Sequence, residues 1–316
     1  MSQPKVIFVS GSGRSGTNIL KELLSLHSQI ASLPFELRFF VDPRGVLDFY
    51  NTYSSYWTPY WSDYKIKELE KFLLSLSTKS EISQVDSELT PTPYADWELS
   101  KCIPGYDNYV HELIEKLTEF KYLGRWPGSE GGIRNNEMYF SAPHSKSELR
   151  NPIGTFLSQC YSAIQREMDY QWFIDDDTHS FLFAADLLDL MPQSKLIHMV
   201  RDPRDVVASL IQQRWAPSDI KHAAFWLVSV MSRWKSQREE LKIGQFVEVK
   251  FEDLVQKRSE TLTYLSDFIG FQIEKSLLSL DMSRHNIGRY KQDLSPEQIK
   301  IVEEVLADLL SEYGYV

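Results

Sequence analysis

Residues 5–18 read KVIFVSGSGRSGTN and predict an apolar strand, a glycine-rich turn and the start of a helix. The three glycines of this turn allow a tight bend and a close approach of the backbone to a ligand. The helix that follows leaves its first N–H groups unpaired, and these groups favour an anion together with the helix dipole. Arg14 adds a permanent cation. We therefore expect this stretch to hold a phosphate or a similar anion.

The glycine spacing alone leaves the ligand open. The pattern G-x-G-x-x-G matches a dinucleotide fingerprint, and Glu36 lies near the distance at which that fold places its ribose-binding acid. The same glycines begin a Walker P-loop, but Thr17 and Asn18 stand where that motif has Lys and Ser or Thr. A nucleoside triphosphatase would therefore lack both its phosphate lysine and its magnesium hydroxyl.

A second strand-to-helix transition lies far along the chain. Residues 195–209 read KLIHMVRDPRDVVAS, in which an apolar strand runs into Arg201 and Pro203 can open the next helix. Ser209 follows two turns further along, so it can share a ligand with Arg201 only if the helix start bends back. A surface turn with local salt bridges is the alternative. A ligand with two separate phosphate ends would need both stretches.

The two stretches resemble the cofactor-binding motifs of sulfotransferases that use 3′-phosphoadenosine 5′-phosphosulfate (PAPS). RSGT after a strand is similar to their loop for the 5′-phosphosulfate, and RDP followed by a helical serine is similar to their 3′-phosphate site. Residues 247–254 (VEVKFEDL) resemble the family's strand that ends in an aromatic-Glu-Asp-Leu turn. Residues 287–291 (IGRYK) resemble its late glycine-arginine-aromatic loop. The likeness covers roughly the first forty residues and most of the chain from Trp172 onward, in the family's order.

In motif style the chain is similar to heparan, tyrosyl-protein and bacterial-type sulfotransferases. The resemblance implies a single domain over residues 1–316, with a P-loop-NTPase-like, three-layer α/β/α fold around a central parallel sheet. The alternation of strands and helices also predicts parallel βαβ units. A short strand at residues 30–33 is expected to run beside the first strand. Residues 45–165, where the likeness fades, are expected to form a substrate-binding insertion.

The expected insertion is rich in Tyr and Trp between residues 48 and 64. Aromatic residues at irregular spacing most often fill a core, but they can also wall a pocket for a sugar or phenol ring. Residues 124–152 carry Pro-Gly, Gly-Gly and Asn-Asn pairs, so we expect mainly loop there and a helix from Ile153 to Met168. Such a loop could cover an acceptor pocket, and both interpretations stay open.

The resemblance also assigns roles to single residues. It implies that the loop holds the 5′ end of PAPS, or of the product adenosine 3′,5′-bisphosphate (PAP), and that the second motif and the late loop hold the 3′-phosphate. The implied binding residues are Gly13, Arg14, Ser15, Gly16, Thr17, Asn18, Arg201, Ser209, Gly288 and Arg289. Arg14 is also a candidate catalytic residue, because a permanent cation can stabilise the departing 5′-phosphate.

Glu36 is the expected catalytic base. Its position after the short strand resembles that of the catalytic glutamate in heparan and tyrosyl-protein sulfotransferases. The alternative is a surface glutamate paired with Arg38 or Arg44. Many cytosolic sulfotransferases use a histidine base instead, and among the seven histidines of this chain His179 is the one to test.

Residues 175–179 (DDDTH) depart from the family. Related enzymes often carry a lysine-threonine-proline sequence here, and its lysine can approach the sulfonate. The departure leaves open how the transferring group is neutralised. An acidic run can also bind a divalent metal, but sulfuryl transfer requires none. We therefore expect a solvated turn and no metal site.

Charge, cysteine content and hydropathy limit the partners and the cellular compartment that we expect for the protein. The formal net charge of −10 argues against a general nucleic-acid or anionic-membrane binder. The two cysteines make no disulfide framework or metal motif and favour free thiols in a reducing compartment. The sequence has no signal-peptide layout and no apolar run of transmembrane length, so a cytoplasmic enzyme is expected.

We therefore predict transfer of a sulfuryl group from PAPS to a hydroxyl group of a sugar, a phenol or another alcohol, by in-line displacement with a glutamate base. The enzyme alternatives are a P-loop kinase-like phosphotransferase and a nicotinamide-dependent oxidoreductase. A nucleotide-binding module without catalytic activity is the third alternative. The sequence reveals neither the acceptor nor the oligomeric state.

Overall fold

A computed structural model describes residues 3–78, 98–126, 136–282 and 286–315 of the chain. The residues cluster into two compact units. The first, which we call the helical unit, comprises Met1–Pro4, Leu37–Asp169 and Asp189–Gln193. The second, the sheet unit, comprises Lys5–Glu36, Tyr170–Leu188 and Ser194–Val316. Both motifs that are predicted to bind anions lie in the sheet unit.

The sheet unit is built on five parallel strands in the order β2-β5-β1-β6-β7. They are β1 (Val6–Gly11), β2 (Ile30–Ser32), β5 (Trp172–Asp175), β6 (Lys195–Val200) and β7 (Phe246–Lys250). β1 and β5 are buried at every residue, as expected for central strands that are covered on both faces. The predicted parallel α/β sheet is confirmed.

One predicted pairing is wrong, because β2 does not run beside β1. It pairs with β5, with Ile30 opposite Trp172, and β5 in turn pairs with β1. β5 is apolar on both faces up to its last residue, which suits an internal strand. β2 has only three residues, which suits the edge of a sheet.

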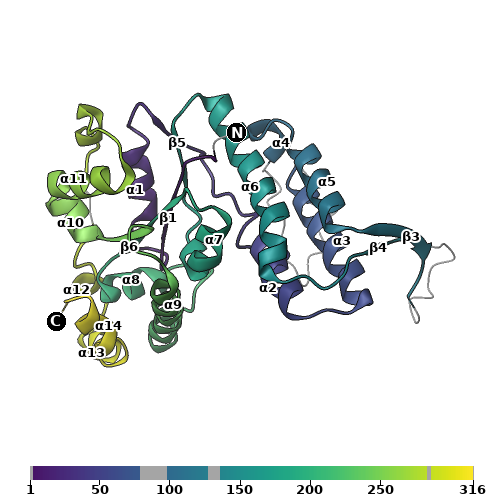
Figure 1. Ribbon diagram of the computed structural model, residues 1–316. Coiled ribbons are helices and arrows are strands. Elements are labelled where there is room, and N and C mark those ends of the chain that lie inside the picture. Colours follow the sequence, from purple (N-terminus) through teal and green to yellow (C-terminus); the bar gives the residue numbers. More distant parts are fainter. Residues whose placement is uncertain (1–2, 79–97, 127–135, 283–285, 316) are drawn as a thin grey trace. The chain divides into compact units, whose positions relative to one another are not determined.

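Helices cover both faces of this sheet (Figure 1). They are α1 (Thr17–Leu24), α7 (Ala184–Leu190), α8 (Pro203–Leu210), α9 (Ile220–Glu240), α10 (Phe251–Gln256), α11 (Arg258–Ile269), α12 (Tyr290–Asp293), α13 (Pro296–Val305) and α14 (Ala307–Glu312), with short 3₁₀ turns η2 (Ser180–Phe183) and η3 (Lys275–Leu278). On one face, Ile7 and Val9 of β1 share a buried cluster with α1, α10 and α11. On the other face, His198 of β6 packs against Phe181 and Trp234. The predicted three-layer arrangement is therefore confirmed within the sheet unit.

The helical unit holds α2 (Val46–Ser55), α3 (Pro59–Ser75), α4 (Leu99–Cys102), α5 (Tyr106–Leu117), α6 (Lys146–Met168) and the antiparallel hairpin β3 (Phe120–Gly124) with β4 (Asn136–Phe140). The prediction of mainly loop over residues 124–152 is wrong at residues 136–140, which form β4, and from residue 146 onward, where α6 runs. α6 begins at Lys146 because Ser145 and Glu148 form a capping box. The Gly-Gly pair of this range lies outside the described residues.

The aromatic run at residues 48–64 divides between core and surface. Phe49, Tyr50 and Tyr53 are buried, and the Tyr53 hydroxyl donates to Ser62 Oγ at 3.0 Å. Tyr56 and Tyr60 are more than half exposed. The first group fills the core of the helical unit, whereas the second group is available on its surface. A substrate-binding role for residues 45–165 stays a prediction.

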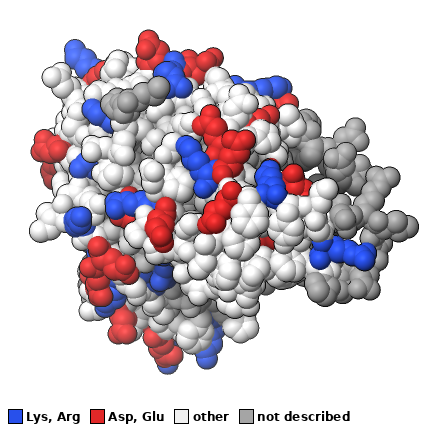
Figure 2. All heavy atoms as spheres, turned by 45° about the vertical axis from the view of Figure 1, so that its right-hand side comes forward, with Lys and Arg blue, Asp and Glu red and all other residues white. Residues whose placement is uncertain are grey.

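The surface of the described residues carries both signs of charge. Figure 2 shows Lys and Arg side chains interspersed with Asp and Glu over the visible face. Within the described ranges no helix is both long and apolar enough to span a membrane. The same residues contain no group of three or more His, Cys, Asp or Glu side chains arranged to hold a metal ion. Cys102 and Cys160 are free thiols.

Candidate active site

The glycine-rich loop (residues 11–16) joins the end of β1 to the start of α1. Gly13, Arg14 and Gly16 have φ angles of 75°, 59° and 99°. A Cβ atom on Gly16 would lie 2.5 Å from the ring of Phe251, so this position requires glycine. A left-handed conformation costs a non-glycine residue such as Arg14 about 1–2 kcal/mol. Such local strain is typical of functional loops, where the surrounding fold maintains it.

Side chains from both motifs meet at Ser209, in the last turn of α8. Arg14 Nε donates to Ser209 Oγ at 2.9 Å, and Arg289 Nη1 donates to the same oxygen at 3.1 Å. Arg201 Nη1 donates to the carbonyl oxygen of Arg14 at 3.2 Å. Two guanidinium groups from distant parts of the sequence therefore meet at one hydroxyl, and the guanidinium of Arg201 bonds to the backbone of Arg14 beside them. A cluster of like charges at this spacing favours a bound anion.

Arg201 is nine-tenths buried and closely held. Its guanidinium stacks 4.9 Å from the centre of the Phe251 ring and donates to the carbonyl oxygen of Asn286. Burial lowers the pKa of Arg201 and the charge of Arg289 adds to this, whereas Asp205 and Glu252 oppose the shift. Arginine nevertheless stays protonated at physiological pH. A buried cation of this kind gains from any further negative group within reach.

Asp205 organises the loop that carries Arg289. The Asp205 side chain is fully buried, and its Oδ2 accepts from the Gly288 amide at 2.7 Å and from Arg201 Nη2 at 3.4 Å. Its other oxygen accepts from the Tyr290 amide at 3.0 Å. The amide of Gly288, a predicted cofactor contact, thus bonds to Asp205. Asp205 was not predicted as a site residue, although a charged residue followed by Val206 in an apolar helix was a usable signal.

Some buried polar atoms at the site have no protein partner. Among the described residues these include Ser15 Oγ and Arg201 Nε. Buried donors and acceptors are normally satisfied, so such atoms point to a ligand or to water. Of the other predicted loop residues, Thr17 is buried while Asn18 and Arg14 are exposed.

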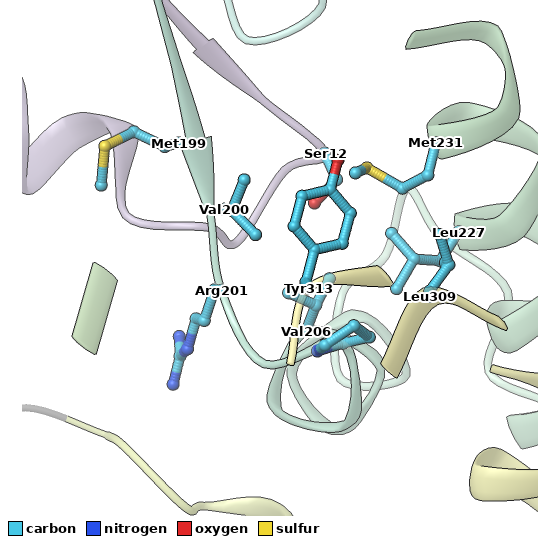
Figure 3. Close-up of a pocket in the computed structure, with 10 residues that line it drawn as sticks. Ser12, Met199, Val200, Arg201, Val206, Leu227, Met231, Leu309 and Tyr313 are labelled. Atoms are coloured by element: carbon cyan, nitrogen blue, oxygen red, sulfur yellow. The ribbon is translucent and has the colours of Figure 1, made fainter. Parts of the chain in front are cut away.

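A small cavity lies beneath the loop, between β6, α8, α9 and the C-terminal helices (Figure 3). Its volume of about 10 Å³ is room for one water molecule at most. Met231, Leu227 and Leu309 face Tyr313 across it, whereas the Arg201 guanidinium points away from them (Figure 3). This cavity is therefore a packing feature and not the ligand site.

Glu36 lies beside the loop and is joined to it through Thr178. Thr178 Oγ1 donates to Glu36 Oε1 at 2.9 Å, and the Thr178 carbonyl oxygen accepts from the Gly11 amide at 3.0 Å. The half-buried carboxylate therefore belongs to the same unit as the arginine cluster. Thr178 was not identified from the sequence, because nothing in the chain around it indicates a long-range partner.

The prediction of a solvated turn at residues 175–179 is wrong. The side chains of Asp175, Asp176 and Asp177 are all buried. Asp175 and Asp177 accept hydrogen bonds from backbone amides two residues later, at 3.1 and 3.2 Å. These local bonds and the central position of β5 explain how a run of carboxylates is accommodated in the interior.

Lys21 of α1 supplies a cation to this acidic run. Its Nζ lies 2.8 Å from Asp176 Oδ2 and also donates to the carbonyl oxygen of Leu33 at 3.2 Å. Lys21 thereby connects the end of β5 to the segment that leads to Glu36. Burial raises the pKa of Asp176 and the charge of Glu36 raises it further, whereas Lys21 lowers it. No sequence signal distinguished Lys21 from an ordinary surface lysine.

Arg204 and His179, which lie next to the motif residues in sequence, make other contacts. Arg204 bonds to Asp202 at 2.8 Å and to Glu303 at 2.9 Å, so it ties α8 to α13. His179 lies 6.3 Å from Trp226, edge to face, next to Thr178. Arg204 therefore stabilises the fold around the arginine cluster, while His179 lies near the predicted base.

The parallel sheet, with a glycine-rich loop after β1 and an arginine–serine cluster after β6, defines an α/β fold with two candidate anion sites in one unit. Comparison with known proteins makes the class more specific. The chain belongs to the Sulfotransferase family, whose sequence profile matches residues 86–275, more than half of the chain.

Particular relatives come from bacteria and from a nematode. The ω-hydroxy-β-dihydromenaquinone-9 sulfotransferase Stf3 of Mycobacterium bovis is 27% identical over 191 residues, which cover 55% of this chain and 48% of that protein. A putative protein-tyrosine sulfotransferase of Caenorhabditis elegans is 24% identical over 131 residues, 39% of this chain and 50% of that protein. The chain thus spans about half the length of the curated relatives it matches.

Solved sulfotransferase structures also match over most of the chain. The sulfotransferase domain of the Synechococcus PCC 7002 olefin synthase has a TM-score of 0.42 at 17% identity, covering 96% of this chain and 95% of that one. Sulfotransferase STF1 of Mycobacterium tuberculosis has a TM-score of 0.47 at 14% identity, covering 97% of this chain and 77% of that one.

Proposed function

We propose that this protein transfers the sulfuryl group of PAPS to a hydroxyl group of an acceptor. The observation that carries the proposal is that Arg14 of the glycine-rich loop and Arg289 both donate to Ser209, while Arg201 donates to the backbone of Arg14. A donor with phosphate at both its 3′ and 5′ positions matches two anion sites in one unit. Membership of the Sulfotransferase family supports the same reading.

The residues of the cluster fit such a donor. Arg201, Ser209 and Arg289 would hold its 3′-phosphate. The loop from Gly13 to Asn18 would hold its 5′ end, with the first amides of α1 directed at the anion. The unpaired Ser15 Oγ and Arg201 Nε offer two further buried donors. Gly288 would contribute indirectly, because its amide fixes the late loop through Asp205.

PAPS supplies the sulfuryl group as the donor substrate. The acceptor oxygen forms a bond to sulfur, the bond between sulfur and the 5′-phosphate oxygen breaks, and its electron pair leaves with PAP. The proton of the acceptor hydroxyl passes to Glu36, which Thr178 orients. Arg14 donates to Ser209 in the structure, and its side chain turns from Ser209 to the 5′ end to stabilise the charge that develops on the leaving phosphate. In this chain Arg14 and the loop amides take over the neutralisation that a lysine near Asp177 provides in related enzymes.

A transfer assay with sulfur-labelled PAPS and an acceptor panel of phenols, sugars, lipids and peptides tests the proposal. We expect labelled product with at least one class. Glu36→Gln should lower turnover by about 10²–10⁴-fold, because a general base contributes on this order. Its affinity for PAP should stay within about twofold. Glu22→Gln, an exposed glutamate on α1, is the matched control. Full activity of Glu36→Gln would remove this residue from the mechanism.

A second candidate is a module that binds PAP without catalysis. The observation that favours it is Asp177, an acidic residue where related enzymes often have lysine. PAP binding without label transfer to any acceptor would support this candidate. Thermal-shift comparison of PAP with ATP and NAD separates both from a kinase-like or nicotinamide-dependent enzyme, since a specific ligand stabilises the folded state.

A further inference from the structure

We infer that Trp215 and Trp226 form one wall of the acceptor site and select a neutral acceptor whose hydroxyl sits on an aromatic ring. This inference rests on the proposed sulfuryl transfer. Both residues lie in the sheet unit. Trp215 belongs to the segment between α8 and α9, and Trp226 lies in the second turn of α9.

The wall begins at the glycine-rich loop. A Cβ atom on Gly13 would lie 3.2 Å from Cη2 of Trp215 and 3.9 Å from Cγ2 of Thr178. The same Thr178 donates to Glu36, the proposed base. The indole of Trp215 and Thr178, which bonds to the base, therefore lie against the same loop residue. An acceptor bound between Glu36 and Gly13 would therefore have this indole within reach.

The aromatic rings continue away from the loop. Trp215 and Trp226 lie 5.9 Å apart between ring centres and are tilted by 58°. Trp226 in turn meets His179 edge to face at 6.3 Å. Despite these contacts Trp215 remains 55% exposed. A large indole left this open beside a charged loop offers apolar contact area to a ligand.

The position of the wall favours the acceptor over the adenine of the donor. Gly13 belongs to the loop that is proposed to hold the 5′ end of the donor, so the wall starts at the reacting end of the donor. The adenosine is separated from that end by the ribose. The acceptor ring is therefore the group that an indole at Gly13 would meet first.

The charges near the base favour a neutral acceptor. The charge of Glu36 acts on the buried Asp176, which is paired with Lys21, and Asp175 and Asp177 are buried on either side of it. An acceptor that carries sulfate or carboxylate groups would meet repulsion here. A phenolic hydroxyl on an uncharged ring fits both the indole wall and the acidic base region.

Calorimetry on the PAP-loaded protein tests the inference with three probes, 2-naphthol, cyclohexanol and methyl β-D-glucoside. We expect 2-naphthol to bind at least about tenfold more tightly than the other two, because stacking on an aromatic face adds this much. Trp215→Ala should weaken 2-naphthol binding by about tenfold, and Trp215→Phe should restore part of it. PAP affinity should stay within about twofold in both variants. Tyr264→Ala, an equally exposed aromatic residue on α11, is the control and should change neither affinity.

The outcomes separate this inference from the function on which it rests. Absence of PAP binding to the unmodified protein would overturn the proposed function. Normal PAP binding with equal affinity for the three probes would overturn the inference alone. Weaker PAP binding in Trp215→Ala would also overturn it, because the indole would then contact the donor.

Discussion

The buried carboxylate of Asp205 holds residues of the candidate binding site in place without being one of the proposed ligand contacts. It accepts from two loop amides and from Arg201. Removing the charge of Asp205 leaves the buried Arg201 without its nearest negative partner. It also removes one of the hydrogen bonds that the Asp205 carboxylate accepts. The effect should therefore appear in ligand binding as well as in stability.

We expect Asp205→Asn to lower the affinity for PAP by about tenfold and the free energy of unfolding by about 2–3 kcal/mol. Calorimetry and urea unfolding measure the two quantities. Asp308→Asn, on the exposed side of α14, is the control. Unchanged PAP affinity in Asp205→Asn would show that the late loop keeps its position without this carboxylate.

The pair of Lys21 and Asp176 allows a test of the acidic run. Both side chains are largely buried, at 14% and 3% exposure. Lys21→Met alone should lower the free energy of unfolding by about 3 kcal/mol, because it leaves a buried carboxylate without its cation. Adding Asp176→Asn should restore more than half of the loss. A double-mutant cycle by urea unfolding measures this, and purely additive losses would contradict the pairing.

At the scale of elements, the loop between β1 and α1 depends on a side chain from far along the chain. Phe251 at the start of α10 packs against Gly16 and under Arg201. This contact gives a physical reason for an aromatic residue in the VEVKFEDL segment. It also couples the two proposed phosphate sites, since the Phe251 ring contacts residues of both.

Gly16→Ala and Gly270→Ala separate steric conflict from backbone conformation. Both glycines have positive φ angles, 99° and 91°. A Cβ atom would meet Phe251 at 2.5 Å in the first case and no atom within 4 Å in the second. We expect a loss of about 1 kcal/mol for Gly270→Ala and about 3 kcal/mol for Gly16→Ala. Equal losses by thermal or urea unfolding would contradict the packing of Phe251 against the loop.

Some helices and strands could be predicted from the sequence, whereas the order of the strands and some helix bounds could not. β1, β6 and β7 are short apolar runs next to turn signals, and their parallel arrangement followed from the alternation with helices. The neighbour of β2 could not be predicted, because strand order depends on contacts across 140 residues that leave no local pattern. The start of α6 was not predicted. Ser145 and Glu148 carry a capping signal, but the glycines and prolines of residues 124–152 favour loop.

The site residues also divide into those that a sequence motif predicted and those that it did not. Arg14, Arg201, Ser209 and Arg289 were predicted from motif likeness, and the structure brings them together. Their roles in binding and catalysis stay predictions. Thr178, Lys21 and the indole of Trp215 act through long-range contacts, and nothing in their immediate sequence marks such contacts.

At the scale of the whole molecule, a buried polar network fixes the C-terminal segment to the sheet. Glu248 of β7 accepts from Trp234 Nε1 at 2.9 Å and from the Tyr313 hydroxyl at 3.2 Å, and it lies 3.1 Å from His198 Nδ1. Burial raises the pKa of Glu248, but these bonds and the charge of Arg238 outweigh it and bring the pKa down to about 2. Burial lowers the pKa of His198.

The direction of both shifts predicts loss of stability in acid. The pKa of Glu248 is lower in the folded state than its ordinary value of 4.5, so its contribution is present above that pH and is lost between about pH 4.5 and 2. His198 is neutral when folded and must gain a proton when unfolded below about pH 6.5, which adds to the loss.

Glu248→Gln should therefore be less stable than the unmodified protein by about 2 kcal/mol near neutral pH, and the difference should shrink as the pH falls through this window. This value is reduced for the 28% exposure of the side chain. Urea unfolding at several pH values measures the difference, with the exposed Glu239→Gln as control. A gap that is independent of pH would contradict the assignment.

The central claim is that the glycine-rich loop and the arginine–serine cluster hold the two phosphate ends of one adenosine nucleotide. Titration calorimetry of PAP against the unmodified protein, with adenosine 5′-monophosphate as the single-phosphate comparison, tests it most directly. We predict that PAP binds at least about a hundredfold more tightly than the monophosphate, and that Ser209→Ala and Arg289→Ala reduce this preference to about tenfold or less. Equal affinity for the two nucleotides, or a preference unaffected by both substitutions, would contradict the account.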